Sequence, residues 1–253
     1  MKGINLSQIT WEEAAEAYKK YSLVMLPIGA GTKEHGKHLP CGTDLLLADE
    51  LARRVVENAP VIALPSLPYA YYPAFVDWPG SVSIQAKHFT DFVADIIKSF
   101  HHFGFQKFLI LDTGVSTHMP LRVLSSDLYN ELGIKVAVTN IVGLLSDVEN
   151  EIAEQKTGGH GDEMETSMIL AIEPGLVNMD KAVEEYTQGI PDNISKSGLL
   201  KISMGGKMIT STGINGNATL ASAEKGNIAL ERIVKDIIRF IEYFEKSCVP
   251  EKD

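Results

Sequence analysis

The sequence predicts an α/β fold, a single-domain sandwich with a mostly parallel central sheet and helices on both faces. Two observations predict it. Short, uninterrupted apolar runs, of the kind that strands buried on both faces require, recur along the chain. Stretches with the spacing of amphipathic helices separate these runs, as in βαβ units. The chain has 253 residues, of which 45% are hydrophobic, so we expect residues 1–253 to form one domain.

The first part of the chain is expected to hold two helices around one strand. Thr10 should cap the first helix, whose first turn carries two glutamates where the helix dipole favours acids. Residues 23–27 then form an apolar strand. Residues 28–43 are rich in Gly and His and have no periodicity, so they indicate a loop. Asp44 opens the second helix, which covers residues 45–56.

The same alternation continues through the middle of the chain. Each of the next two helices is followed by a glycine, the residue that commonly ends a helix by adopting the left-handed backbone. The expected elements are strands at 60–65, 107–112 and 134–139 and helices at 86–103 and 120–132.

The last third is less regular. It predicts a helix at 163–172, a loop or irregular strand at 187–206 and a long closing helix at 221–246. In parallel sheets of this kind ligands bind beyond the carboxyl ends of the strands. The loops after Pro27, Pro65 and Asp112 are therefore the places where chemistry is expected.

Charge and composition exclude several functions. The chain has 23 Lys and Arg against 33 Asp and Glu, a net charge of −10, which argues against nucleic acid or an anionic membrane as the main partner. No apolar run reaches the length of a membrane span, and the first residues lack the apolar core of a signal peptide, so we expect a cytoplasmic protein. Two cysteines are too few for a disulfide framework or a thiolate metal cluster.

The densest polar cluster directly follows the first strand. It holds Glu34, His35 and His38, with Asp44 shortly after them. Two imidazoles and two carboxylates on one loop suit a borderline divalent metal such as Zn²⁺, Mn²⁺ or Fe²⁺. The alternative is an ordinary solvated loop.

Two further clusters contain histidine. His160 lies in a Gly-rich approach to a helix that starts with acids, so it suits proton transfer, and Glu165 suits a metal ligand. The alternative is a capped helix, because acids stabilise any helix N-terminus. The third cluster runs from Asp112 to His118 at the end of a strand. Its residues serve equally well as caps.

Several short motifs, taken together, make the chain similar to the creatininase (creatinine amidohydrolase) family. They span most of the chain and occur in the family's order. They are LPIGA at 26–30, EHGKHLP at 34–40 with Asp44, WPG at 78–80, His160, ETS at 165–167, GING at 213–216 and ASAEKG at 221–226.

The resemblance implies an α/β sandwich with a binuclear metal centre, hydrolysis of a cyclic or acyclic amide C–N bond, and often a homohexamer. It also implies roles for individual residues. His35 corresponds to the family's first-loop His, and Asp44 corresponds to the Asp that bridges the metals. Glu165 resembles a Glu close to the metals, and His160 resembles the His of proton transfer.

Two positions depart from the family pattern. The family usually has Glu-x-His, but this chain reads Lys33-Glu34-His35. Either Glu34 reaches the ion through a bulged loop, or Lys33 stands in the ligand's place. The family's His after the third strand is Val115 here. His118 then either replaces it as a ligand or is a surface residue.

We therefore expect a divalent-metal-dependent hydrolase of a small amide, with one or two ions. The metal is Zn²⁺, or alternatively Mn²⁺ or Fe²⁺, and His160 carries the proton to the departing nitrogen. The expected ligands are Glu34, His35, Asp44, His118 and Glu165. The rival hypothesis is a catalytically impaired protein with the family fold, which binds a small molecule or a single ion.

Aromatic residues crowd the stretch 68–78. Clustered aromatics mark an interface or the wall of a ligand site, so we expect a homo-oligomer, with Trp78 contacting the substrate. The alternative is that these side chains fold onto their own domain.

Overall fold

The computed structural model describes residues 2–186 and 210–246. A five-stranded sheet runs through these residues, and all four of its strand pairings are parallel. The predicted α/β fold is thereby confirmed. In spatial order the strands are β1 (Ile4–Asn5), β3 (Ile62–Ala63), β2 (Leu23–Ile28), β4 (Lys107–Asp112) and β5 (Lys135–Val138).

Helices connect the strands and cover the sheet. They are α1 (Trp11–Lys20), α2 (Thr43–Asn58), α3 (Ala86–His102), α4 (His118–Leu132), α5 (Ile141–Ile152), α6 (Glu163–Ile172) and α8 (Ala223–Lys246). Short 3-10 turns lie at Leu6–Gln8, Pro73–Phe75, Pro174–Leu176, Met179–Lys181 and Ala218–Leu220. A second, two-stranded antiparallel sheet pairs β6 (Glu184–Glu185) with β7 (Gly216–Asn217).

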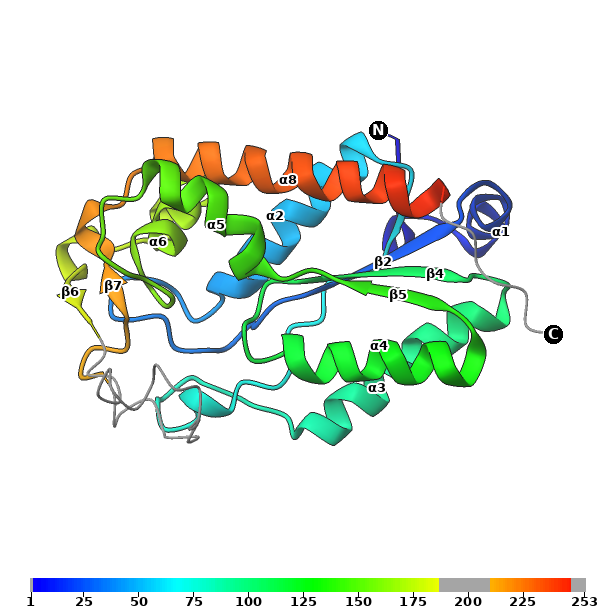
Figure 1. The fold of residues 1–253 in the computed structure, drawn as a ribbon, viewed down its shortest axis with the longest axis horizontal. Helices are drawn as coiled ribbons and strands as arrows, with labels where there is room; N and C mark the ends of the chain where they lie inside the picture. Colours follow the sequence, from blue (N-terminus) through cyan, green and yellow to red (C-terminus); the bar gives the residue numbers. More distant parts are fainter. Residues whose placement is uncertain (1, 187–209, 247–253) are drawn as a thin grey trace.

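Two hydrophobic layers hold the sheet between the helices. Figure 1 shows α2, α5, α6 and α8 on one face and α3 and α4 on the other. Successive strand residues point to opposite faces, so Met25 packs in the layer of α2 and α8, whereas its neighbour Leu26 packs in the layer of α3 and α4. Burial on both faces explains why residues 23–28 are apolar without alternation.

The capping signals act as predicted. Thr10 and Glu13 form a reciprocal capping box at the start of α1, in which the Thr10 backbone N–H donates to Glu13 Oε2 at 2.8 Å. Gly133 ends α4 with a left-handed backbone, φ 74°. The capping box therefore fixes where α1 begins, and Gly133 fixes where α4 ends.

Some elements differ from the prediction. The sequence analysis assigns no element to residues 141–152, yet they form α5, which buries Ile141, Leu145 and Val148 along one face. The strand expected at 60–65 pairs only at Ile62–Ala63, and α4 begins at His118 instead of residue 120. The segment expected as loop or irregular strand at 187–206 lies outside the described residues.

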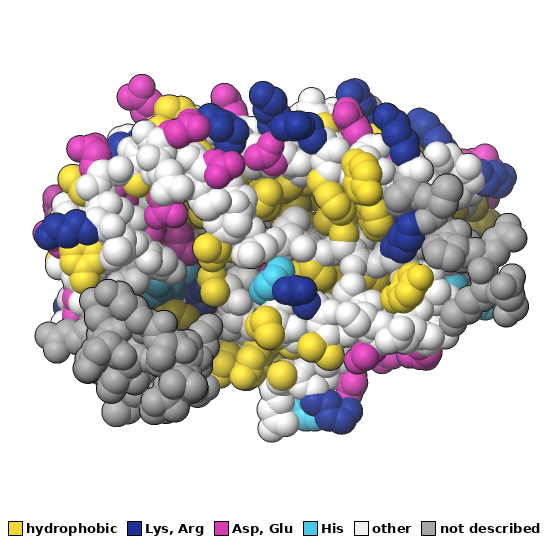
Figure 2. Space-filling view, viewed as in Figure 1, with side chains coloured by type: hydrophobic (Ala, Val, Ile, Leu, Met, Phe, Trp, Pro, Cys, Tyr) yellow, Lys and Arg dark blue, Asp and Glu magenta, His cyan; other side chains and the backbone are white. Residues whose placement is uncertain are grey.

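A groove of about 710 Å³ lies away from the carboxyl ends of the strands. It borders the start of β5, where Tyr129, Phe240 and Tyr243 line it. Figure 2, seen from the same side as Figure 1, shows hydrophobic side chains in the middle of the molecule and mixed charges along its upper edge. No helix within the described ranges is both long and apolar enough to cross a bilayer.

Candidate metal centre

The loop between β2 and α2 carries the first half of the site. His35 is 1% exposed, and its Nε2 lies 2.9 Å from Oδ1 of Asp44, the second residue of α2. Its Nδ1 lies 3.0 Å from the Lys33 carbonyl oxygen. The Thr113 hydroxyl at the end of β4 donates to the Asp44 carbonyl oxygen at 2.9 Å, which ties the start of α2 to the sheet.

Lys33 also points into this loop. Its Nζ lies 2.6 Å from Asp44 Oδ2, and only 6% of its side chain is exposed. Burial opposes the charge on Asp44, but the Lys33 ammonium and His35 hold the pKa of this carboxyl below its usual range. Lys33 therefore faces the aspartate directly.

Glu34 takes a different direction from Lys33. Its Oε1 accepts a hydrogen bond from the Gly36 N–H, and its Oε2 lies 3.1 Å from His160 Nε2. Gly213 permits this placement, because a Cβ at that position would overlap the Glu34 carboxylate. Glu34 thus contacts the second histidine of the site.

The turn before α6 supplies the second half of the site. Asp162 caps α6 by accepting from the N–H groups of Met164 and Glu165, each at 3.0 Å. The Gly161 N–H donates to Glu165 Oε2 at 2.6 Å, and His160 Nδ1 lies 3.9 Å from the same oxygen. One turn of chain therefore brings His160 and Glu165 together.

The two halves meet. The rings of His35 and His160 have centroids 4.8 Å apart. One donor atom from each of His35, His160 and Glu165 lies within 4.8 Å of the other two. Three nitrogen and oxygen donors with room for a further ligand are the arrangement that proteins use for catalytic zinc.

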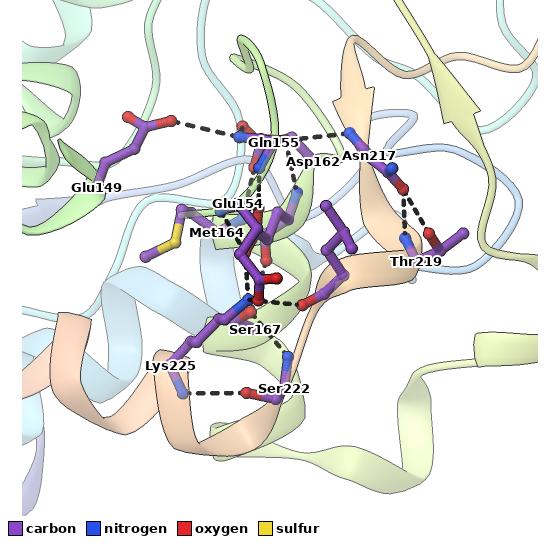
Figure 3. A network of polar contacts seen from close by, with 12 residues as sticks. Glu149, Glu154, Gln155, Asp162, Met164, Ser167, Asn217, Thr219, Ser222 and Lys225 are labelled. Carbon is purple, nitrogen blue, oxygen red and sulfur yellow. Dashed lines mark hydrogen bonds and ion pairs between the residues drawn. The ribbon is translucent and has the colours of Figure 1, made fainter. Parts of the chain in front are cut away.

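A polar network fixes the turn that carries His160 and Glu165. Figure 3 shows Gln155 and Asp162 between Glu149 on one side and Asn217 on the other. Gln155 Nε2 donates to Asp162 Oδ2 at 2.9 Å, and the Asn217 N–H donates to Gln155 Oε1 at 3.0 Å. Beside them Lys225, from the ASAEKG motif, lies 2.5 Å from the buried carboxylate of Glu163. The motif therefore supports the start of α6.

Burial shapes the proton affinities in the site. It lowers the pKa of His160 to about 4, although the hydrogen bond to Glu34 opposes this shift. It raises the pKa of Glu165 to about 8, with the charge of Asp44 adding to the effect. The imidazole is therefore neutral at pH 7, so one ring nitrogen has a lone pair that can accept a proton.

Two predicted positions lie elsewhere in the structure. Nδ1 of His118 donates to the Thr139 carbonyl oxygen at 3.1 Å, and the described residues that converge on the centre do not include His118. Asp112 accepts from the Thr117 hydroxyl at 2.7 Å and from the Gly114 N–H at 3.1 Å, so it ties the loop after β4 and does not cap α4. The described residues at the end of β4 thus supply no member of the group.

The aromatic stretch forms part of the wall. The Phe75 ring lies 4.2 Å from the His160 ring, measured between centroids, and Tyr72 is buried in the core. Lys33 Nζ lies 5.2 Å from each of the Tyr72 and Phe75 rings. Trp78 is partly buried just beyond them. Phe75 is not among the residues predicted for the site, although the crowding of aromatic residues at 68–78 is the signal for a wall or an interface.

The sequence comparison agrees with this geometry. The family model described as creatinine amidohydrolase matches residues 7–241. The chain belongs to the creatininase family. Among curated relatives it is 28% identical to creatinine amidohydrolase of Pseudomonas putida over 93% of this chain and 95% of that protein. It is 26% identical to 3-dehydro-scyllo-inosose hydrolase of Thermotoga maritima over 93% of this chain and 84% of that protein. The family's curated members are therefore enzymes with different substrates.

Solved structures show the same fold. A crystal structure of creatinine amidohydrolase has a TM-score of 0.85 and 25% identity, over 98% of this chain and all of the other. Creatininase is also known in a manganese form, at TM-score 0.81, 25% identity and 96% and 99% of the two chains. A mutant creatininase is known in a Zn–Zn form, at TM-score 0.79, 24% identity and the same two coverages.

The residues of this chain fit a divalent ion. A carbonyl oxygen only accepts, so the bond to Lys33 places the proton of His35 on Nδ1. Its Nε2 then turns a lone pair toward the Asp44 carboxylate, where only a second proton or a cation makes the contact favourable. Burial and the charge of Lys33 lower the pKa of His35, which disfavours the second proton. A metal ion near His35 Nε2 and the Asp44 carboxylate therefore makes this contact favourable more readily than a second proton on His35 does.

Metal uptake should strengthen as the pH rises toward 8. Glu165 must lose its proton to bind an ion, and its pKa is raised to about 8, so affinity should fall about tenfold per unit below that pH. His160 adds no dependence above pH 5, because its pKa is about 4. Zn²⁺ titrations by calorimetry at several pH values measure the slope. Glu165→Gln should flatten it, and an equal slope in this variant would assign the proton to another group.

Proposed function

We propose that this protein is a divalent-metal-dependent hydrolase that cleaves the C–N bond of a small amide, cyclic or acyclic. The convergence of His35, His160 and Glu165, with Asp44 behind His35, carries the proposal. A bound Zn²⁺, Mn²⁺ or Fe²⁺ would lower the pKa of a water ligand toward about 7 and polarise the amide carbonyl. The protein's own groups then bind, orient and move protons.

His35 and Asp44 form the fixed part of the site. Both side chains are almost fully buried, and the Lys33 carbonyl orients the imidazole so that Nε2 faces inward. A ligand whose other ring nitrogen is held in this way needs little reorganisation to bind an ion. In the proposal these two residues hold the metal together with the Glu165 carboxylate.

His160 is the group that handles protons. The Glu34 carboxylate accepts from Nε2 of His160, which leaves Nδ1 facing Glu165 Oε2 at 3.9 Å. Neutral His160 takes the proton of the attacking water at Nδ1. The departing nitrogen then receives this proton from the imidazole, which gives it up readily because burial lowers its pKa to about 4. The Phe75 ring against His160 limits access of water.

A chelation experiment tests the proposal. The protein is stripped with a chelator, reloaded with Zn²⁺, Mn²⁺ or Fe²⁺, and assayed on a panel of small cyclic and acyclic amides that includes creatinine. The substrate of the second relative, 3-dehydro-scyllo-inosose, belongs in the panel because that protein aligns over 93% of this chain. Activity should vanish on stripping and return with one of the metals.

Other outcomes of the chelation experiment separate the hypotheses. Hydrolysis that survives complete stripping would refute metal dependence. Metal uptake without turnover of any panel member would favour the rival, a protein with the family fold that binds an ion without catalysis. Turnover of 3-dehydro-scyllo-inosose alone would support the proposed metal site but would show that the substrate is not an amide.

A further inference from the structure

Each oxygen of the Asp44 carboxylate contacts a different side chain, one from His35 and one from Lys33. Oδ1 lies 2.9 Å from His35 Nε2, and Oδ2 lies 2.6 Å from the Lys33 ammonium. Only 2% of the Asp44 side chain is exposed, so water does little to neutralise it. The Lys33 ammonium is therefore already paired with one of the two oxygens of the carboxylate.

A carboxylate that bridges two metal ions presents one oxygen to each of them. Asp44 has this arrangement, but a compact ammonium stands at Oδ2. The rings of Tyr72 and Phe75, each 5.2 Å from Nζ, enclose the ammonium. A hydrated ion at that point would have to displace a buried, paired charge, which is costly.

The described residues near the end of β4 also add no donor to the converging group. Val115 has no donor atom in its side chain and is 58% exposed. His118 uses Nδ1 on the Thr139 carbonyl oxygen, and Asp112 accepts from Thr117 and Gly114. Among the residues that the structure describes, the converging metal donors are His35, His160 and Glu165.

We propose that the Lys33 ammonium permanently occupies the second cation position beside Asp44, so that each subunit takes up one divalent ion. This inference rests on the proposed function, because it concerns the same centre. Lys33 is a positioning residue here: it neutralises Oδ2 and holds Oδ1 toward His35. The centre would then combine one metal with one fixed ammonium, in contrast to the Zn–Zn form known for a mutant creatininase.

Metal stoichiometry tests this directly. Native mass spectrometry and elemental analysis, after equilibration with excess Mn²⁺ or Zn²⁺ and desalting, should give one ion per wild-type subunit. Lys33→Glu replaces the ammonium with a carboxylate and should take up two. Lys37→Glu is the matched control, because it makes the same charge change at an exposed position of the same loop and should keep one ion.

The outcomes separate this inference from the proposed function. Two ions in the wild type would overturn the inference and leave the proposed metal hydrolase intact. No ion in the wild type would overturn the proposed function itself. One ion in a Lys33→Glu variant with native circular dichroism would also overturn the inference. If that variant does not fold, the wild-type count still decides between one ion and two.

Discussion

Replacing His35 by alanine is expected to remove most of the bound metal and to lower kcat/KM by at least about 100-fold. The side chain is 1% exposed and supplies the donor atom that lies nearest to Asp44. Its removal leaves Asp44 Oδ1 without its imidazole partner and breaks the group of three converging donors. Elemental analysis and steady-state kinetics on the same preparation measure both effects.

His118→Ala is the matched control for this experiment. It removes an imidazole from the end of the neighbouring strand, where Nδ1 donates to the Thr139 carbonyl oxygen. We expect this variant to keep its metal and most of its activity. Full metal content in a folded His35→Ala protein would contradict the site, and loss of metal in His118→Ala would restore His118 as a ligand.

The fold could be predicted because its strands have a simple physical signature. Residues 23–28 and 107–112 are buried on both faces, so their apolar runs are unbroken. Helix α5 also has a local signature, because its apolar residues at 141, 144, 145 and 148 have the spacing of one helix face. The prediction assigns no element there although the pattern is present. The helix that α5 packs against, α8, is about 80 residues away in the sequence, so a local pattern could not predict this contact.

Much of the site could also be predicted, because its residues cluster in two short stretches. His35 and Asp44 follow one strand, and His160 and Glu165 flank one helix start. The sequence did not determine the direction of Lys33 and Glu34, because side chains on an irregular loop follow no period. His118 is the nearest donor along the chain to Val115, but in the structure α4 begins there and its Nδ1 donates to the Thr139 carbonyl oxygen.

Gly226→Ala is expected to cost about 2 kcal/mol of unfolding free energy or more, although alanine normally favours a helix over glycine by about 1 kcal/mol. Gly226 lies where α8 crosses α6, and a Cβ there would come 1.9 Å from the Ser167 carbonyl oxygen. That atom is backbone, so no change of side-chain conformer relieves the overlap, and the two helices must separate. The ASAEKG motif therefore contains both Lys225, which pairs with Glu163, and the glycine that permits the crossing.

Gly143→Ala is the matched control for Gly226→Ala, because Gly143 lies in α5 and a Cβ there would meet only the Asn140 side chain, no closer than 3.5 Å. This variant should be neutral or more stable by up to about 1 kcal/mol. Urea unfolding followed by circular dichroism measures both changes. Gly226→Ala should also shift His160 and Glu165 through α6 and weaken metal binding, whereas Gly143→Ala should leave it unchanged. Equal stabilities of the two variants would show that α6 and α8 separate at no cost, and that the close crossing does not hold the centre in place.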